Sequence, residues 1–588
     1  MCGIVGYLGN QNAEKYLIEG LKRLEYRGYD SSGIALLDRS NQYTVKSLGR
    51  VKDLEDKFSS DYSFNKGIAH TRWATHGAVN EQNAHPHTSH DGRFIVVHNG
   101  VIDNYKDIEA DYLSHIVKHT ETDTETIANL LSINVRRYDY LDALKETFSI
   151  LEGSFALVIL DQENPDKLIL AKNKSPLIIG KNHDQVMIAS DVLALAGFVE
   201  EIHVMDDQTF GWISREDFVF YSQDGSPLTI QFDAFQVDPV LSSRGQYPHY
   251  MLKEIFEQPE IIERLVMHAV HEGFDASIKP LFNDATSIEI IAAGTSYHAG
   301  LYAKKLIERE LNISTHVHVA SEFAYYPPTS ADNPLFVFIS QSGETADLIA
   351  CLPFIQSIDS SIITLTNVAT SRLAKEADVS IDLLAGPEIA VASTKAFTAQ
   401  IATFALLIDY LKESKVFQKA LSDVANEMQR LLDEHDKIKI FIEHFLTTHN
   451  AFFIGRGLDY TIALEASLKL KEISYIQSEA FPAGELKHGT IALIEKDTPV
   501  ITLLTEEKTA KLTRANIEEL KARGASSFVI SQASIAYKDD QVQIKHIHPL
   551  LDALVAIIPS QLIAYYAALQ RGHDIDKPRN LAKSVTVE

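Results

Sequence analysis

Two different patterns of hydrophobic and polar positions divide the chain. Up to about residue 235, short apolar or alternating runs such as RFIVVHNG and SFALVILD are separated by turn residues, which is typical of antiparallel strands. Helical periodicity appears at 12–25 and 122–150. Strands grouped in this way with a few helices predict a layered α+β domain over residues 1–235, and not a βαβ repeat.

A second pattern begins near residue 285, where short apolar strands alternate with helices. This alternation favours parallel α/β sheets. Residues 288–308 resemble 452–472, LFVFIS resembles PVITLL, and SIITLT resembles SSFVIS, at offsets of about 161–165 residues. Shared strand–turn–helix patterns also arise by chance, but a constant offset predicts two tandem copies of one unit.

The polar stretch QVDPVLSSRGQYPHY contains Pro, Ser and Gly without periodicity, so we interpret it as a linker. The last residues of the chain, 574–588, also lack strong periodicity, which by itself is typical of a disordered tail. The predicted order is a first domain at 1–235, a linker at 236–250, an α/β domain with a leading helix at 251–425, a second α/β domain at 426–573 and a tail at 574–588.

Composition narrows the class of protein. A chain of 588 residues corresponds to roughly four domains, and 45% hydrophobic with 23% charged residues excludes disorder and coiled coil as overall classes. The formal net charge of −26 disfavours phosphate backbones and anionic lipids, so neither nucleic acid nor membrane is expected as a partner. The apolar stretch 550–569 is interrupted by Asp552, Pro559 and Gln561, and the N-terminus lacks a basic region. We expect a cytoplasmic protein.

The chain contains only two cysteines, Cys2 and Cys351, which excludes a disulfide framework and iron–sulfur clusters. Cys351 lies in an apolar helical segment and is expected to be structural. Removal of Met1 would free the α-amine of Cys2, whose pKa of roughly 7.7–8.0 suits a base for its own thiol. The alternative is that Cys2 is a small buried hydrophobic residue.

Other residues of the first domain supply the remaining parts of an amide-cleaving site. In HNG, Asn99 and the Gly100 amide would form an oxyanion hole. In TRWATHG, Arg72 can bind a carboxylate with two hydrogen bonds, and Asp123 in ETDTE can pair with an ammonium group. A thiol, an oxyanion hole, a cation and an anion together suit the side-chain amide of an amino acid.

The motifs MCGIVGY, YRGYDSSGIA, TRWATHG, NAHPH, HNGVIDN and TETDTE resemble those of the class II glutamine amidotransferases. The resemblance implies an N-terminal-nucleophile fold, an αββα sandwich, in which Cys2 attacks glutamine, forms a glutamyl thioester and releases ammonia. It also implies further roles: glutamine binding by Arg72, Thr75, His76, Gly100 and Asp123, a gate at Trp73, a framework role for Arg27, and a contact toward the sugar domain at His85.

Six histidines between His70 and His98 leave a metal site as an alternative. No HExxH or comparable ligand pattern accompanies them, and cysteine ligands are nearly absent. We therefore expect no metal, and core or inter-site contacts for these histidines.

In the second half, SQSGETAD at 340–347 lies between an apolar strand and a helix. Hydroxyls and backbone amides would converge there on a helix N-terminus, a geometry that binds phosphate. An ordinary N-cap and turn would explain the same residues, and the missing GK[ST] excludes a P-loop. Lys469 and Glu472 share one helix face, either as a solvated ion pair or as a carboxylate base near a sugar carbon.

These segments, together with HYMLKEIFEQPE and PRNLAKSVTVE, resemble tandem sugar-isomerase domains, which are flavodoxin-like and bind phosphosugars. The resemblance implies that Lys583 forms a Schiff base with a ketose, His488 assists ring opening, and Glu472 moves a proton between C1 and C2. The tail would then be ordered over the sugar site. Sugar-phosphate binding is implied for Thr295, Ser296, Ser340, Gln341, Ser342, Thr345, Ser393 and Lys469. Ala293 stands where several relatives have cysteine, which puts little in doubt.

Together the two resemblances imply glutamine and fructose 6-phosphate as substrates, internal ammonia transfer, no cofactor and a homodimer. Asparagine synthetase, glutamate synthase and amidophosphoribosyltransferase are disfavoured because an SGGxDS loop, cluster cysteines and an acidic pair after ITLTN are missing. A non-catalytic sugar-phosphate sensor of the same architecture is the remaining alternative. A sensor would need phosphate ligands but not Cys2, Glu472, His488 and Lys583 together.

Overall fold

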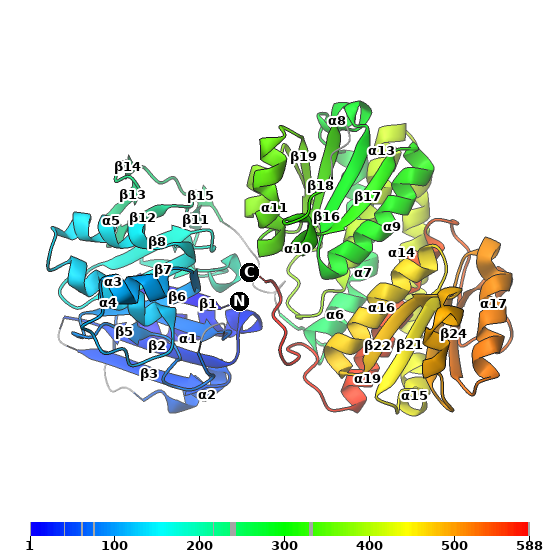
Figure 1. The fold of residues 1–588 in the computed structure, drawn as a ribbon, viewed down its shortest axis with the longest axis horizontal. Helices are drawn as coiled ribbons and strands as arrows, with labels where there is room; N and C mark the ends of the chain where they lie inside the picture. The colour runs from blue at the N-terminus through cyan, green and yellow to red at the C-terminus, as the bar shows by residue number, and fades with distance from the viewer. Residues whose placement is uncertain are drawn as a thin grey trace. The chain divides into compact units, whose positions relative to one another are not determined.

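The computed structural model describes residues 2–39, 41–59, 63–74, 77–215, 217–235, 243–328 and 333–585. The chain divides into two compact units, one built by residues up to Ser243 together with the chain end from Ser584, and one by Arg244–Lys583 (Figure 1). Of the predicted linker, residues 236–242 lie outside the described residues, and Tyr250 already begins a helix.

The first unit contains two antiparallel sheets. The eight-stranded sheet has the order β15 (Asp233–Ala234), β11 (Glu201–Val204), β9 (Ile178–Lys181), β10 (Gln185–Ala189), β1 (Gly3–Gly9), β4 (Lys66–Arg72), β2 (Ser31–Leu37) and β3 (Gln42–Leu48). The seven-stranded sheet has the order β14 (Pro227–Leu228), β13 (Phe218–Ser222), β12 (Thr209–Ile213), β8 (Leu168–Asn173), β7 (Gly153–Asp161), β6 (Phe94–Ile102) and β5 (His87–Thr88).

Three hydrophobic cores stack these sheets into four layers. Residues such as Ile4 and Ile68 of one sheet pack against Val97 and Val158 of the other. The outer faces are covered by helices: α1 (Ala13–Leu24) and α2 (Val51–Lys57) on the first sheet, α4 (Asp123–Asn134) and α5 (Tyr140–Ile150) on the second, with α3 (Tyr105–Asp111) beside α4. The predicted αββα sandwich is confirmed.

The second unit contains two five-stranded parallel sheets. The first has the order β17 (Ser314–Val319), β16 (Ser287–Ala292), β18 (Pro334–Ser340), β19 (Ile362–Thr366) and β20 (Val379–Asp382). The second has the order β22 (Gln477–Pro482), β21 (Asn450–Gly455), β23 (Pro499–Leu504), β24 (Ser526–Gln532) and β25 (Val542–Ile544). Both follow the flavodoxin-like order 2-1-3-4-5, which confirms two tandem copies of one parallel α/β fold.

Helices cover both faces of these sheets (Figure 1). Because both faces are buried, central strands such as β16 and β18 are continuous apolar runs and not alternating ones. The first repeat has α6 (Tyr250–Phe256), α7 (Gln258–His271), α8 (Ile278–Asp284), α9 (Gly294–Leu311), α10 (Ala320–Phe323), α11 (Ala346–Ser357), α12 (Arg372–Glu376) and α13 (Lys395–Lys412). The second has α14 (Val416–Asp433), α15 (His435–Phe445), α16 (Leu458–Ser474), α17 (Glu507–Lys521), α18 (Asp552–Val555) and α19 (Ile557–Gln570).

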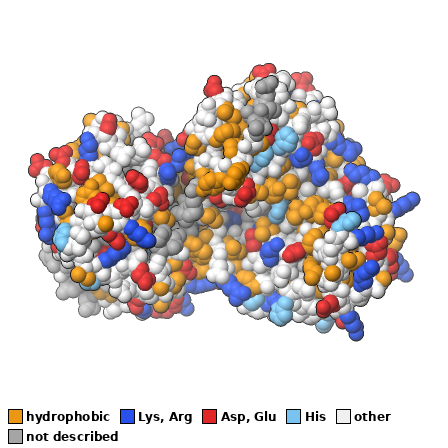
Figure 2. Space-filling view, in the orientation of Figure 1, with side chains coloured by type: hydrophobic (Ala, Val, Ile, Leu, Met, Phe, Trp, Pro, Cys, Tyr) orange, Lys and Arg blue, Asp and Glu red, His pale blue; other side chains and the backbone are white. Residues whose placement is uncertain are grey.

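One hydrophobic core runs through both repeats, and α9 packs against α16 where they meet. Among the described residues, the helical stretch Asp552–Gln570 passes a length-and-composition test for a membrane span, but 94% of it is buried inside the fold. That burial is what the core helix of a domain shows. On the face seen in Figure 2, basic and acidic side chains are interspersed.

Candidate active sites

Cys2 lies directly before β1, beside the end of β4, because Gly3 pairs with Thr71 in the antiparallel ladder. The Trp73 amide donates to Cys2 Sγ at 3.2 Å, and Asn99 Nδ2 donates to the Cys2 carbonyl at 2.9 Å. Burial raises the pKa of the Cys2 thiol, and the Trp73 amide and the Arg72 charge oppose that rise. The side chain is therefore held as a thiol that needs a base before it can attack.

Asn99 and Gly100 lie on β6, next to Cys2. Gly100 has a φ of +127°, and a Cβ there would lie 1.9 Å from the Ser154 carbonyl oxygen. Only glycine fits this position, because the backbone angle and the neighbouring strand both exclude a side chain. The Asn99 side-chain amide therefore lies beside the cysteine, and Gly100 follows it in the strand.

Arg72 ends β4 and Asp123 opens α4, and both side chains are buried. The Asp123 carboxylate accepts from the Ile102 amide at 2.9 Å. Burial lowers the pKa of the Arg72 guanidinium, against the charges of Cys2, Asp30 and Asp123. The structure therefore brings the predicted cation and anion to the predicted nucleophile. Thr75 and His76 lie outside the described residues.

Arg27 and Trp73 have structural partners close to this site. Arg27 forms a buried ion pair with Asp191, and Tyr26 donates to the same carboxylate at 2.8 Å. Trp73 packs edge-on against Tyr29, with ring centroids 5.7 Å apart. Arg27 is thus fixed inside the domain, as a framework role requires.

Buried histidines form a chain behind Asn99. His70 Nε2 lies 3.1 Å from Asn99 Oδ1 and 3.1 Å from His85 Nδ1, and His85 Nε2 lies 3.1 Å from Thr124 Oγ1. Burial lowers the pKa of His70 to about 3 and that of His85 well below its usual range, so both rings are neutral. In the part of the chain that the structure describes, no group of three or more potential ligands is arranged to hold a metal ion. Sequence reasoning expected a core or inter-site contact for His70 and missed that this ring lies at hydrogen-bond distance from Asn99.

In the second unit, the segment 340–345 connects β18 to α11. Ser340 Oγ accepts from the Gly343 amide at 2.9 Å and lies 3.3 Å from Thr345 Oγ1, while Ser342 Oγ accepts from the Glu344 amide at 3.2 Å. Gly343 has a φ of +65°, and a Cβ there would lie 2.0 Å from Ser371 Oγ. The loop, which includes Gln341, is thus folded tightly at the carboxyl edge of the sheet, where α/β folds bind ligands.

Three charged residues line one face of α16, at spacings of four and three. Lys469 Nζ lies 2.6 Å from Glu472 and 3.4 Å from Glu465, and donates to Thr295 Oγ1 at 3.0 Å. Glu465 also accepts from Thr295 at 3.0 Å and contacts His298 at 2.8 Å. Burial raises the pKa of Glu472, opposed by Lys469. The Lys469 end of the predicted ion pair is therefore buried, Glu472 is half-buried, and Lys469 joins the two repeats through Thr295.

Lys583 is buried and forms an ion pair with Glu388 at 2.6 Å. The Lys583 charge also opposes the rise in the pKa of Glu472, so Lys583 belongs to the same cluster as Glu472 and Lys469. The tail before it is ordered: the Asp576 carboxylate accepts from the Tyr250 and Met251 amides, each at 2.9 Å. A disordered tail is thus not what the described residues up to 585 show.

Of two further predicted residues, Ser393 contacts this cluster directly, whereas Ser296 bonds a side chain of α13. Ser393 donates to Glu388 at 2.8 Å, and Ser296 accepts from Gln400 Nε2 at 2.9 Å. Sequence reasoning missed Glu388 and Glu465. The signal for Glu388 was the AGPE turn after an apolar strand, and for Glu465 the shared helix face with Lys469.

His488 is not brought to this cluster within its own chain. It lies exposed on the short 3-10 helix Glu485–His488. Among the described residues it has no hydrogen bond or ion pair with the residues named above.

The second repeat fills the corresponding crevice with its own carboxyl groups. Asp459, in the first turn of α16, accepts from the Thr505 amide at 2.9 Å and from Thr505 Oγ1 at 2.5 Å. Glu506 accepts from the Leu458 amide at the start of the same helix. Carboxyl oxygens thus satisfy the helix-terminal donors that a phosphate would otherwise meet. The loop of the first repeat has the hydroxyls of Ser340, Ser342 and Thr345 at this position, and the carboxylate of Glu344 in the same loop accepts from the Arg372 amide at 2.8 Å.

Asp459 predicts how stability depends on pH. Burial raises its pKa from 3.8 to about 7, so the folded protein keeps a proton that the unfolded chain has lost. This stabilisation is full below pH 3.8 and is lost as pH rises through about 7. We expect the urea midpoint of unfolding to fall between mildly acidic and neutral pH, and Asp459→Asn to flatten that fall. An unchanged slope in the variant would contradict the assignment.

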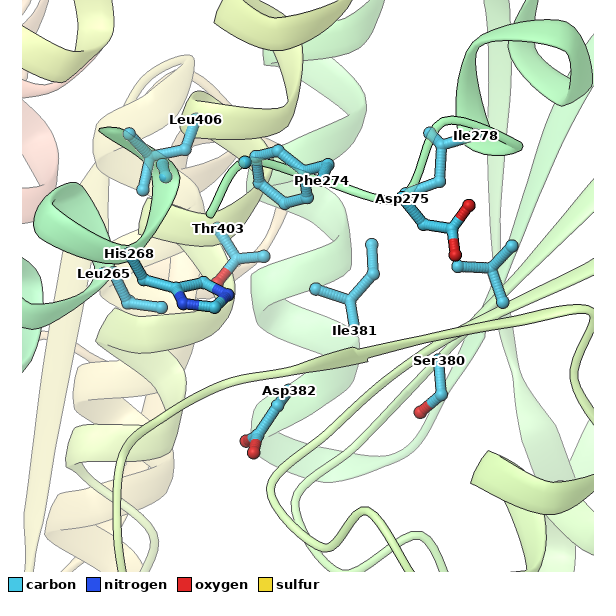
Figure 3. Close-up of a pocket in the computed structure, with 13 residues that line it drawn as sticks. Leu265, His268, Phe274, Asp275, Ile278, Ser380, Ile381, Asp382, Thr403 and Leu406 are labelled. Carbon is cyan, nitrogen blue, oxygen red and sulfur yellow. The ribbon is translucent and has the colours of Figure 1, made fainter. Parts of the chain in front are cut away.

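The cavity drawn in Figure 3 lies apart from this cluster. It measures about 210 Å³ and lies between α7, β20 and α13, with His268, Asp275 and Asp382 among its polar residues. None of the predicted site residues lines it.

Comparison with known proteins agrees with this architecture. The chain matches the model of the glutamine amidotransferase domain at residues 70–197 and that of the SIS domain at 281–409 and 444–571. Fold and sites therefore define a glutamine amidotransferase domain joined to two SIS domains.

Full-length relatives narrow the family. The chain is 46% identical over 601 residues to glutamine–fructose-6-phosphate aminotransferase (isomerizing) of Listeria monocytogenes, and 45% over 603 residues to that of Staphylococcus aureus, with 100% of each chain covered. A solved C-terminal domain of the Francisella tularensis glucosamine–fructose-6-phosphate aminotransferase aligns with 57% of this chain and 99% of its own, with 35% identity and a TM-score of 0.55. The chain belongs to the glutamine–fructose-6-phosphate aminotransferase (isomerizing) family, and is an enzyme.

Proposed function

We propose that this enzyme converts L-glutamine and D-fructose 6-phosphate into L-glutamate and D-glucosamine 6-phosphate, the first committed step toward amino-sugar nucleotides. The observation that supports it most is the buried cluster of Lys583, Glu388, Lys469 and Glu472 in a chain that also presents Cys2 beside Asn99. A sensor would have no use for these reactive groups. No cofactor is part of the proposal.

In the glutaminase half, Cys2 attacks the glutamine amide carbon after its own α-amine, freed by removal of Met1, takes the thiol proton. Asn99 and the Gly100 amide hold the oxyanion. Arg72 and Asp123 bind the substrate's carboxylate and ammonium groups, with Thr75 and His76 completing the pocket. The amide nitrogen leaves as ammonia, and water then hydrolyses the thioester to glutamate.

In the sugar half, the neutral hydroxyls of Ser340, Ser342 and Thr345 hold the phosphate, together with Gln341, Thr295, Ser296 and Ser393. Lys583 forms an imine with the open-chain ketose. Glu472, whose raised pKa suits a group that both accepts and returns a proton, shuttles hydrogen between C2 and C1. Lys469 sets the charge of that carboxyl group.

Ring opening is assigned to His488. This side chain is exposed and makes no hydrogen bond or ion pair with the cluster among the described residues. A second copy of the chain would supply it, which supports a homodimer. Ammonia passes internally from the glutaminase site to the sugar site. Trp73 acts as the gate, Arg27 belongs to the framework of the glutaminase site, and His85 makes a contact toward the sugar domain. We also propose a cytoplasmic location, supported by the burial of the apolar stretch Asp552–Gln570.

The test is to incubate the enzyme with amide-¹⁵N glutamine and fructose 6-phosphate. We expect the label to appear in glucosamine 6-phosphate, with one glutamate formed for each amino sugar. The same reaction with excess unlabelled ammonium shows whether transfer is internal. If it is, the amino sugar retains the label, because ammonia from solution does not mix with the ammonia released from glutamine. Binding of fructose 6-phosphate without any amino sugar would favour the sensor instead.

A further inference from the structure

Glu254 on α6 is a buried acid that the mechanism above does not use. Its Oε1 accepts two backbone hydrogen bonds, from the Ile389 amide at 2.6 Å and the Ala390 amide at 3.1 Å. Its Oε2 is also buried and has no hydrogen-bond partner among the described residues. An unpaired carboxylate oxygen is costly to bury, whereas a protonated carboxyl group is far less so.

The two amides that Glu254 holds directly follow Glu388, the counter-ion of Lys583. Glu388 Oε2 receives Lys583 Nζ at 2.6 Å, and Oε1 accepts from the Thr394 amide at 2.8 Å and the Ala396 amide at 3.1 Å. The segment 388–396 is therefore fixed by Glu254 on one side and fixes Lys583 on the other. Loss of the first contact would release the second.

Charges around Glu254 come from three elements. Glu388 lies on the segment 388–396, Lys395 lies at the start of α13, and Lys583 comes from the tail. Lys395 is itself paired with Glu257 at 2.7 Å. Burial, and then the Glu388 charge, raise the pKa of Glu254 to about 8, against Lys583 and Lys395. Glu388 is bonded directly to the lysine and keeps its charge, because Lys583 lowers its pKa.

We propose that Glu254 is a positioning residue for Lys583: as a neutral carboxyl group it anchors the Glu388 segment, so that the lysine faces one negative charge and not two. The proposal rests on the proposed function, in which Lys583 forms the imine. It goes beyond that function by assigning a role to the helix α6 that leads into the first repeat.

The charge count matters for the chemistry of the imine. Lys583 begins as an ammonium, and its amine adds to the ketose carbonyl only after one proton has moved to Glu388, 2.6 Å away. Two protons then leave with the carbonyl oxygen as water, one of them returned by Glu388, and one stays on the iminium nitrogen. A second carboxylate beside the lysine would hold the ammonium more tightly and slow the addition.

The experiment compares Glu254→Gln with Glu254→Ala in the full-length enzyme. Gln keeps the Oε1 acceptor without a charge, so we expect near-native synthesis at neutral pH. Ala removes the anchor, and we expect synthesis to fall about a hundredfold, with an equal loss of fructose 6-phosphate trapped on Lys583 by borohydride. Glutamine hydrolysis should be unchanged in both variants, which controls for folding of the first unit.

A pH profile separates positioning from mere structural support. As pH rises through about 8, Glu254 of the native enzyme ionises and synthesis should decline, whereas Glu254→Gln should lack that decline. A native rate of synthesis and a native amount of sugar trapped on Lys583 in Glu254→Ala would overturn the proposal. A Glu254→Gln variant as impaired as Glu254→Ala would also overturn it. Retained synthesis in Lys583→Ala would instead overturn the proposed function on which this role depends.

Discussion

Cys2→Ala should make no amino sugar from glutamine and should still make it from ammonia. Removal of a catalytic nucleophile costs on the order of 10⁶-fold in kcat, and no other described side chain beside Asn99 offers a thiol. The sugar cluster lies in the other compact unit and contains no atom of Cys2, so its chemistry should survive. The measurement is glucosamine 6-phosphate formed with glutamine, and separately with ammonium chloride at a pH that provides free ammonia.

The chain supplies its own matched control. Cys351 is the only other cysteine, and it is buried in the core between α11 and β18, where, among the described residues, its Sγ donates only to the backbone carbonyls of Asp347 and Ala320. Cys351→Ala should retain synthesis from both nitrogen sources, and thiol-directed inactivation should still label Cys2 in that variant. Glutamine-dependent synthesis in Cys2→Ala would show that the nucleophile was wrongly assigned. N-terminal sequencing of the native enzyme establishes whether Met1 is removed.

Most residues of the candidate glutaminase site could be predicted from the sequence, because they lie in short local motifs. Asn99 and Gly100 are adjacent in the chain, and the glycine is required by its positive φ and by the neighbouring backbone of Ser154. Arg72 lies at a strand end, which ladder pairing brings to Cys2. His70 was missed because its role depends on a hydrogen bond across strands to Asn99, which no local pattern encodes.

The sugar site was less predictable because its charges come from distant segments. Glu254, Glu388 and Lys583 belong to a leading helix, a loop and the tail, and only the folded chain shows that they form one buried cluster. The repeat was visible in the sequence, but not that Asp459 and Glu506 close the crevice of its second copy. A carboxyl group at a helix start is also an ordinary cap, so the sequence alone could not separate these meanings.

Lys583→Ala should lose synthesis from either nitrogen source and keep glutamine hydrolysis. Without the ε-amine no imine can form, and a buried Glu388 loses its only cation at bonding distance among the described residues. Borohydride reduction with fructose 6-phosphate should add a hexitol phosphate to the native Lys583 peptide and nothing to the variant. Because the residues proposed for glutamine hydrolysis, Cys2, Arg72 and Asp123, belong to the first unit, this activity reports folding independently of the sugar chemistry.

Lys583→Arg separates the covalent role of the lysine from its charge. Arginine keeps a cation against Glu388 but is a poor imine former because its guanidinium stays protonated. We expect this variant to bind fructose 6-phosphate near normally and yet to make no product. Lys577→Ala, on the same tail, is the control for general disturbance and should remain active. Substantial synthesis in Lys583→Arg would show that the residue acts as a counter-ion and not as the imine-forming amine, because charge alone would then suffice.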